Sequence, residues 1–259
     1  MTNLNAKEFE KRNKKFIDLM NKDEKILDIS KKWFLESIRN EYSYHFSWLG
    51  RPIIQYPQDI IALQEIIWKT KPDIIIETGI ARGGSIIFSA SILEIIGKGE
   101  VIGIDIKIRN ENKKEIKNHP LYKRIHMLEG SSIDKNIVKK IKNIIGDKKK
   151  ILVILDSNHT HKHVFNELKL YSTFVSKSSY LIVFDTIIDD IPNELLKNRP
   201  WGENNNPKSA VKEFLKINNR FRIDKSIEKK LLFTAAPMGY LKCVKNNKDK
   251  KITKRSSKR

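Results

Sequence analysis

The chain has 259 residues, a formal net charge of +20 and 39% apolar residues. This length predicts one large domain, or one domain with an appendage, and apolar runs such as Val101–Ile106 exclude a wholly disordered chain. No stretch reaches the roughly 18–20 uncharged apolar residues that span a bilayer, and the charged N-terminal segment lacks the apolar core of a secretory signal. The single Cys243 excludes an intrachain disulfide and a Cys-rich zinc site, so we expect a cytoplasmic protein.

The positive charge has two interpretations. Lysines make up 40 of the 51 basic residues and are scattered along the chain, as on an ordinary solvated surface. Nucleic-acid readers instead gather Arg and Lys on one face, so nucleic acid is not the expected partner. The segment Lys242–Arg259 holds nine basic residues and one acidic residue, Asp249. We expect residues 246–259 to be a disordered basic tail suited to an anionic surface.

The predicted elements alternate along most of the chain. Residues 1–40 are expected to form one or two polar helices, residues 41–56 an irregular aromatic segment, and Asp59–Lys69 a helix. Strands are expected at Asp73–Glu77, Val101–Ile106, Arg124–Leu128, Ile151–Leu155 and Ser179–Phe184, and the helices after the first four at Gly84–Ile96, Asn110–Asn118, Ile133–Ile145 and His161–Phe174. An insertion at Thr186–Asn206, a helix at Pro207–Ile217 and short strands at Phe221–Asp224, Leu231–Thr234 and Tyr240–Val244 complete the chain. This alternation predicts a mostly parallel α/β sheet with helices on both faces.

The first strand runs into a glycine-rich turn, Glu77 to Ser85, of the form E-x-G-x-x-x-G-G-S. Its spacing is neither the dinucleotide fingerprint G-x-G-x-x-G nor a P-loop, which ends in Lys-Ser/Thr. Glycine permits a sharp turn and the close approach of a ligand. The acidic residue at the strand end disfavours a pyrophosphate and suits a cationic ligand, although a plain strand-to-helix turn explains the same residues.

Acidic and small residues also follow the next two strands. Asp105 ends the second strand, where a carboxylate can accept hydrogen bonds from both ribose hydroxyls, or can cap the next helix. Gly130 and Ser131 follow the third strand and leave room for a flat base. Together with Glu77 and the glycine turn, these residues resemble the S-adenosylmethionine site of class I methyltransferases.

A longer pattern resembles the cephalosporin hydroxylase and rhamnosyl O-methyltransferase family over Trp48–Leu241. Its segments are Trp48-Leu49-Gly50, Ile54-Gln55-Tyr56-Pro57, Ile75 to Ser85, Leu155-Asp156-Ser157-Asn158-His159-Thr160-His161, Phe184-Asp185-Thr186, Pro200-Trp201-Gly202 and Asn206-Pro207. The resemblance implies a Rossmann-like class I methyltransferase fold with a seven-stranded, mostly parallel sheet, preceded by N-terminal helices. It divides the chain into a helical segment and aromatic lid (1–56), a catalytic domain (57–245) and the tail (246–259).

The resemblance also implies an S-adenosylmethionine-dependent O-methyltransferase that acts on a hydroxyl of a sugar, glycolipid or related secondary metabolite and is commonly a homo-oligomer. The residues implied to hold the cofactor are Glu77, Gly79, Ala81, Gly83, Gly84, Ser85, Asp105, Gly130 and Ser131. Asp156 and Asp185, at the ends of strands four and five, are implied to bind a divalent metal such as Mg²⁺.

This chain departs from the family's metal-binding pattern, because Phe184 stands where such members carry a second carboxylate beside Asp185. Asp189 or Asp190 could substitute, or two carboxylates and waters could suffice, since Mg²⁺ keeps several waters. His159, beside Asp156, is the expected general base, with Asp156 the second expected catalytic residue. His161 and His163 are expected to cap or line a helix rather than to bind zinc.

Two further assignments remain open at this level. His45, Trp48, Arg51 and Tyr56 could form a lid over the substrate, or Trp48 and Tyr56 could be ordinary core residues. The alternative functions are an oxygenase component, as the family's hydroxylase name suggests, and a non-enzymatic protein whose basic tail binds an anionic partner. The acceptor itself is not readable from the residues.

Overall fold

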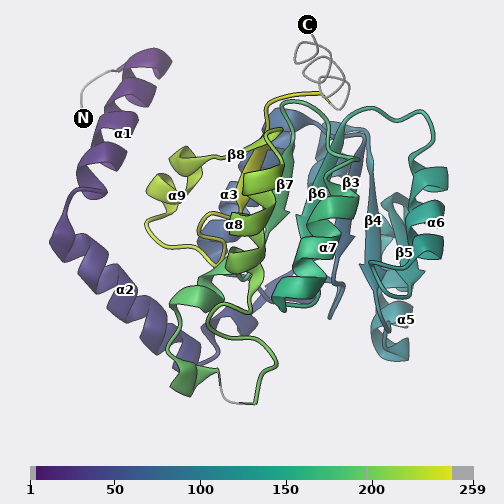
Figure 1. Ribbon diagram of the computed structural model, residues 1–259. Helices are drawn as coiled ribbons and strands as arrows, with labels where there is room; N and C mark the ends of the chain where they lie inside the picture. Colours follow the sequence, from purple (N-terminus) through teal and green to yellow (C-terminus); the bar gives the residue numbers. More distant parts are fainter. Residues whose placement is uncertain (1–3, 197, 247–259) are drawn as a thin grey trace, which may run out of the picture.

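The computed structural model describes residues 4–196 and 198–246, and a seven-stranded sheet forms its centre (Figure 1). The strands follow one another across the sheet in the order β5 (Ile125–Glu129), β4 (Glu100–Asp105), β3 (Ile74–Thr78), β6 (Ile151–Leu155), β7 (Tyr180–Val183), β9 (Tyr240–Cys243) and β8 (Phe221–Ile223). The first five are parallel, and β9 pairs antiparallel with both of its neighbours. The predicted mostly parallel sheet is therefore confirmed.

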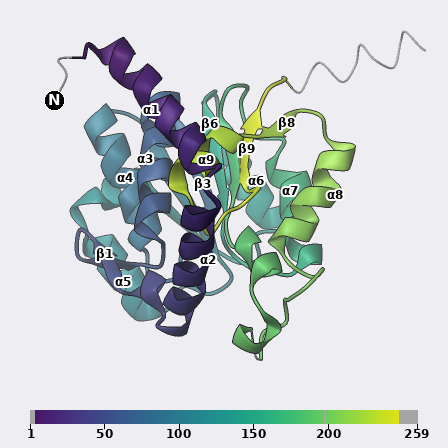
Figure 2. The same cartoon turned by 90° about the vertical axis from the view of Figure 1, so that its left-hand side faces the viewer.

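Helices cover both faces of this sheet and create two apolar cores (Figure 2). Core side chains on one face come from α3 (Pro57–Thr70), α4 (Gly84–Ile96) and α5 (Asn110–Asn118). Those on the other face come from α6 (Lys135–Ile145), α7 (His161–Tyr171) and α8 (Pro207–Ile217). Strands buried on both faces are mostly apolar, as in Ile74–Ile76 of β3 and the whole of β6. These apolar runs explain why both strands could be predicted from the sequence.

Two N-terminal helices form an arm at the edge of the molecule (Figure 1). α1 (Ala6–Met20) has no buried residue, whereas α2 (Glu24–Arg39) buries Phe34 and Ser37. Capping side chains begin both helices, Asn5 in α1 and Asp23 in α2. None of the helices in the described part of the chain is both long and apolar enough to span a bilayer.

The segment 41–56 is more regular than expected. It contains a short antiparallel hairpin of β1 (Phe46–Trp48) and β2 (Arg51–Ile53), whose turn places Leu49 and Gly50 at positive φ. The Trp48 indole donates a hydrogen bond to Ser91 and packs edge-on against Phe88. The hairpin is thus packed on α4, and its three-residue strands were too short for a period to be recognised.

The predicted strand at Leu231–Thr234 is wrong. Asp224 caps the N-terminus of α9 (Lys225–Leu231), whose last residue is Leu231, and Leu232 then takes a positive φ. Beyond it, Thr234 and the Ala235 amide donate hydrogen bonds to the buried Asp59 on α3. Because Asp59 accepts these hydrogen bonds, the segment after α9 is held against α3 and does not pair with the sheet.

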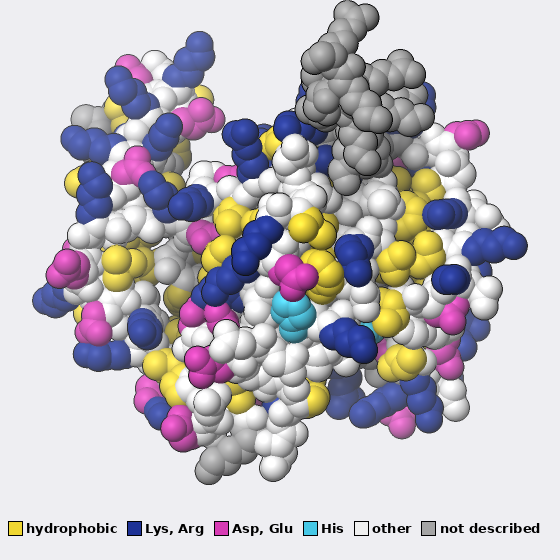
Figure 3. All heavy atoms as spheres, viewed as in Figure 1, with side chains coloured by type: hydrophobic (Ala, Val, Ile, Leu, Met, Phe, Trp, Pro, Cys, Tyr) yellow, Lys and Arg dark blue, Asp and Glu magenta, His cyan; other side chains and the backbone are white. Residues whose placement is uncertain are grey.

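Basic side chains show no single patch on the face seen in Figure 3, where Asp and Glu lie between Lys and Arg. Ion pairs such as Lys98–Asp73 and Lys148–Glu100 place acids beside lysines in the described region. This distribution agrees with a solvated lysine-rich surface. The predicted basic tail lies outside the described residues from residue 247 on.

The packing of Gly84 generates a stability prediction. A Cβ on this glycine would lie 2.2 Å from the Pro52 carbonyl oxygen and 2.7 Å from the Ile53 Cα, both backbone atoms of the hairpin. We expect Gly84→Ala to lower the free energy of unfolding by about 2–3 kcal/mol, because backbone cannot yield as a side chain does. The matched control is Gly202→Ala, whose Cβ would meet only the Asn193 side chain at 3.8 Å. Urea unfolding checks both, and equal stability of the two variants would contradict the packing argument.

Candidate active site at the carboxyl ends of the strands

The functional candidates converge because the five parallel strands end at one edge of the sheet. Thr78 pairs with Leu155 across β3 and β6, and Asp105 pairs with Glu129 across β4 and β5. The strand order reverses direction between β3 and β6, which is where α/β sheets of this kind bind ligands.

A cavity of about 410 Å³ opens at this position. It is lined by Gly79, Ala81, Ile104, Asp105, Ile106, Gly130, Ser131, Ser132, Asp156, Ser157, Asn158 and His163. The structure thus brings five of the nine predicted cofactor residues together around one space. The other four, Glu77, Gly83, Gly84 and Ser85, do not line it.

Asp105 stabilises the glycine turn as well as facing the cavity. Its Oδ2 accepts hydrogen bonds from the backbone amides of Ile80 (2.9 Å) and Ala81 (3.1 Å), and its Oδ1 accepts one from the Lys107 amide (3.2 Å). A carboxylate oxygen accepts more than one hydrogen bond, so Oδ1 keeps capacity for a ligand hydroxyl. The sequence did not predict that Asp105 stabilises the glycine turn, because this contact depends on the turn folding back toward β4.

The glycines of the turn are required mainly by neighbouring protein. A Cβ on Gly79, which has φ +95°, would lie 1.9 Å from the Asp156 carbonyl oxygen. A Cβ on Gly83 would overlap the Ile116 side chain at 2.6 Å. At Gly79 the missing Cβ therefore lets the β3 and β6 loops approach each other, while the expected close approach of a ligand stays a prediction.

The second functional feature is a cluster of metal-ligating groups. One ligand atom each from Asp156, His159 and Asp185 lies within 4.8 Å of the others, and His159 Nε2 is 3.3 Å from Asp185 Oδ2. Two carboxylates and an imidazole are a donor set that suits a divalent cation, so the residues present fit a metal ion. The predicted pair Asp156 and Asp185 is brought together, with His159 as a third neighbour.

Asp189 and Asp190 do not replace the missing carboxylate. Asp189 accepts from Asn206 at 2.6 Å and pairs with Lys212 at 3.1 Å, while Asp190 pairs with Lys208 at 2.6 Å. Both carboxylates instead tie the insertion to α8. Phe184, at the position of the absent carboxylate, is buried in the core.

A second cavity, of about 330 Å³, reaches the cluster from the side of the arm. His159, Asp185 and Trp201 border it, and the Trp201 ring packs edge-on against His159 with 4.7 Å between centroids. Tyr56 also borders it, although its hydroxyl is 2.9 Å from Ser37 Oγ in the core. Arg51 instead braces the turn by donating to the Arg82 carbonyl. Of the expected lid residues, only Tyr56 lines this cavity.

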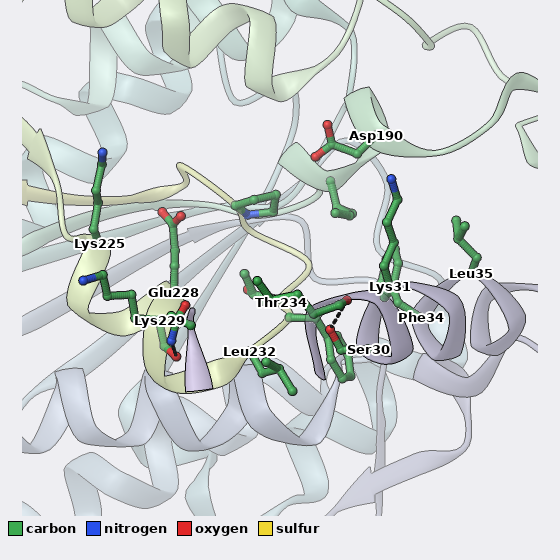
Figure 4. Close-up of a pocket in the computed structure, with 15 residues that line it drawn as sticks. Ser30, Lys31, Phe34, Leu35, Asp190, Lys225, Glu228, Lys229, Leu232 and Thr234 are labelled. Carbon is green, nitrogen blue, oxygen red and sulfur yellow. Dashed lines mark hydrogen bonds between the residues drawn. The ribbon is translucent and has the colours of Figure 1, made fainter. Parts of the chain in front are cut away.

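A third cavity, of about 660 Å³, lies between α2 and α9 (Figure 4). Lys31, Phe34 and Leu35 of α2 border it, as does Leu232 after α9. Phe34 and Ile187 line both this cavity and the one beside His159. The two spaces therefore adjoin. The larger of them is lined by apolar side chains together with three lysines and two acids, Lys31, Lys225, Lys229, Asp190 and Glu228.

The other two histidines lie apart from the metal cluster, as expected. His161 contacts Ser209 Oγ through Nδ1 (2.8 Å) and Glu213 Oε2 through Nε2 (2.9 Å), which joins α7 to α8. His163 contacts Ser132 Oγ through Nε2 at 3.0 Å, and it lines the cavity at the strand ends.

Glu77 is a buried acid beside the site. Its Oε1 accepts a hydrogen bond from Ser85, and no partner is recorded for Oε2 in the described region. Burial raises the pKa of this carboxyl to about 7, against the lowering effect of Ser85. Burial, and then the charges of Asp185 and Glu77, also hold the pKa of Asp156 well above its ordinary value.

Glu77→Gln is expected to remove a pH dependence of stability. Because folding raises the pKa from 4.5 to about 7, the stabilisation from this group is present below pH 4.5 and is lost as the pH rises through 7. The wild type should therefore lose about 3 kcal/mol relative to Glu77→Gln between pH 4.5 and pH 8. Urea unfolding across this range measures the difference. The variant Glu10→Gln, at an exposed position, should parallel the wild type, and a parallel Glu77→Gln curve would contradict the raised pKa.

Comparisons with known proteins identify the family of this chain. The family model described as Rhamnosyl O-methyltransferase/CmcI matches residues 40–244. The rhamnosyl O-methyltransferase of Mycobacterium bovis (strain BCG / Pasteur 1173P2) is 31% identical over 186 residues, which cover 71% of this chain and 72% of that protein. That of Mycobacterium leprae (strain TN) is 28% identical over 198 residues, covering 75% and 82%.

Solved structures of CmcI share the fold. The chain is similar to an apo-structure of CmcI with a TM-score of 0.54 and 19% identity, covering 78% of this chain and 77% of that one. A CmcI structure with Mg and SAM gives a TM-score of 0.52 and 19% identity over 78% of each chain. With the family model matching most of the described residues, the chain belongs to the rhamnosyl O-methyltransferase/CmcI family.

Proposed function

We propose that this chain is an S-adenosylmethionine-dependent O-methyltransferase that acts on a hydroxyl of a sugar, a glycolipid or a related metabolite. One observation carries the proposal: two cavities meet at the metal-ligating cluster. Asp156 borders the cavity at the strand ends, while His159 and Asp185 border the cavity beneath the arm. A methyl donor in the first space and a hydroxyl acceptor in the second would meet at these three residues. Membership in a family of O-methyltransferases supports it.

The cofactor's cationic and hydroxyl groups match the side chains at the strand ends. Asp105 would accept hydrogen bonds from the ribose hydroxyls, and Gly130 and Ser131 leave room for the base. Gly79 and Ala81 would contact the amino-acid part through their backbone. Glu77, Gly83, Gly84 and Ser85 would then act indirectly, by shaping the turn and adding acidity beneath it.

Methyl transfer requires an oxygen placed in line with the sulfonium methyl group and a group that accepts its proton. Bound S-adenosylmethionine supplies the electrophilic methyl. His159 is the base in this proposal, because its ring borders the acceptor cavity and is oriented by Asp185 and Trp201. The Asp185 carboxylate stabilises the positive charge that the imidazole gains when it takes the proton.

Asp156 and Asp185 would hold a divalent ion such as Mg²⁺. Asp156 accepts a hydrogen bond from Gln55 at 3.1 Å, which orients its carboxylate from the side of α3. A metal ion there would act as a Lewis acid and favour ionisation of the acceptor hydroxyl. The solved structure of CmcI with Mg and SAM supports this choice of ion.

The acceptor is proposed to extend beyond a single sugar ring. The cavity between α2 and α9 adjoins the one at His159 through Phe34 and Ile187. Its apolar lining would receive a non-sugar portion of the acceptor, while Lys31 at the rim suits polar or anionic substituents. The names of the curated relatives support a rhamnosyl group as the methylated sugar.

The oxygenase alternative finds little support in the donor set. Non-haem iron oxygenases use two histidines and one carboxylate, whereas this cluster offers one histidine and two carboxylates. His161 and His163 have other partners. The cytoplasmic setting, the homo-oligomer, the division of the chain into domains and the role of the tail stay predictions.

Calorimetry with S-adenosylmethionine tests the cofactor. We expect binding by the wild type and affinity at least about tenfold weaker for Asp105→Asn, because a neutral amide is a weaker acceptor of ribose hydrogen bonds than a carboxylate. Asp147→Asn, at an exposed position, is the control. Absence of binding by folded wild type at hundreds of micromolar would overturn the cofactor assignment, and unchanged affinity of Asp105→Asn would show that the ribose lies elsewhere.

His159→Gln tests the base. We expect kcat to fall by about 10²–10⁴, with unchanged affinity for S-adenosylmethionine, since the side chain lies on the acceptor side of the cluster. The readout is release of S-adenosylhomocysteine with an alkyl rhamnoside as acceptor. His161→Gln, at the first residue of α7, should keep kcat within a few-fold. Equal losses in both variants would argue that His159 has no separate chemical role.

A further inference from the structure

A buried acid that is not one of the metal-ligating residues lies beside the cavity at the strand ends. Glu167 on α7 has 0% exposure, and its Oε1 accepts a hydrogen bond from Ser157 Oγ at 2.8 Å. For its Oε2, no partner is recorded in the described region. Burying a carboxylate with an unpaired oxygen costs free energy. This cost indicates that the Glu167 side chain has a role beyond packing.

His163, one turn earlier on α7, links this acid to the cavity wall. Its Nε2 is 3.0 Å from Ser132 Oγ and 3.5 Å from Glu167 Oε1. Ser132 follows β5 and Ser157 follows β6, so the imidazole joins the two loops that enclose the cavity. Tyr171 strengthens the junction by donating its hydroxyl proton to the Ser132 carbonyl at 2.8 Å.

The contacts of Nε2 favour one form of the ring. Ser157 Oγ donates its proton to Glu167 Oε1, so toward His163 Nε2, 3.5 Å away, this oxygen can only accept. Glu167 Oε1, also 3.5 Å from Nε2, is a second acceptor, and a proton on Nε2 serves both. Nδ1 is then an acceptor, and no partner of Nδ1 is recorded among the described residues. The side chain is 19% exposed and lines the cavity, so an acceptor is offered on its wall.

The position of this acceptor matches one end of the cofactor. With the ribose at Asp105, the base would extend toward Gly130 and Ser132, which line the same cavity as His163. Adenine carries an exocyclic amino group, which is a donor, whereas hypoxanthine carries a carbonyl oxygen at that position. An imidazole acceptor would distinguish the two bases.

We propose that His163, oriented by Glu167 and Ser132, accepts a hydrogen bond from the adenine amino group and makes the site selective for an adenosyl cofactor. The inference rests on the proposed function, since it assigns the base end of the same cofactor. It adds a specificity residue that does not touch the reacting atoms.

The test compares S-adenosylhomocysteine with its deaminated analogue S-inosylhomocysteine by calorimetry. We expect the wild type to bind the adenosyl compound at least about tenfold more tightly, because a lost hydrogen bond leaves Nδ1 facing a carbonyl oxygen. His163→Phe keeps an aromatic ring without the acceptor. It should lose about tenfold in affinity for the adenosyl compound and bring the ratio close to one, with little change for the inosyl compound.

Two variants separate recognition from general stability. Glu167→Gln should reduce the ratio partially, because the amide holds the ring less firmly in the required form. His161→Phe, whose ring faces α8, should keep the wild-type ratio. If His163→Phe fails to fold, ¹⁵N NMR of imidazole-labelled wild type replaces it. The His163 Nδ1 resonance should then shift toward hydrogen-bonded values on addition of S-adenosylhomocysteine.

The outcomes distinguish the two proposals. A wild type that binds neither compound overturns the proposed function. A wild type that binds both compounds equally, a His163→Phe variant that keeps the tenfold preference, or an Nδ1 resonance unmoved by bound ligand overturns the role of His163 alone.

Discussion

The close approach of the β3 and β6 loops is the constraint on which the site depends. The Asp156 amide donates to the Thr78 carbonyl at 2.9 Å, and a Cβ on Gly79 would overlap the Asp156 carbonyl oxygen. Only glycine at position 79 permits this contact. It places the Asp156 side chain where the two cavities meet, and the turn that Asp105 stabilises lies on the other side. The proposed positions of cofactor, metal and acceptor all follow from this junction.

The site concentrates negative charge beneath a basic surface. Glu77 and Asp59 are fully buried, and burial raises their pKa values to about 7 and about 6. With Asp156, they border a small internal space next to the strand ends, in a chain whose net charge is +20. A nearby cation stabilises the charged form of a buried carboxylate. A sulfonium cofactor and a divalent ion both carry positive charge and therefore both suit this site. The overall charge therefore says little about the ligand.

Much of the fold could be predicted, because buried parallel strands are continuous apolar runs and their ends are marked by Gly, Asp and Glu. The helix Pro207–Ile217 has the predicted bounds, and the sheet has the predicted class. The error at Leu231–Thr234 and the missed hairpin concern short segments whose structure depends on distant partners, Asp59 in one case and α4 in the other. The sequence could not show that Asp189 and Asp190 form ion pairs with lysines of α8 and are therefore not free to bind a metal ion.

The sequence by itself determined the strand–turn–helix units and the family pattern, since periodicity and the E-x-G-x-x-x-G-G-S turn are local properties. Which residues share a space was decided by the tertiary structure. It separated Gly79, Ala81 and Asp105, which line the cavity, from Glu77 and Ser85, which do not line it. It also added His159 to the metal cluster and His163 to the cavity wall. The reason is physical: strand order and loop contacts bring together residues that are far apart in sequence, and no local pattern records those distances.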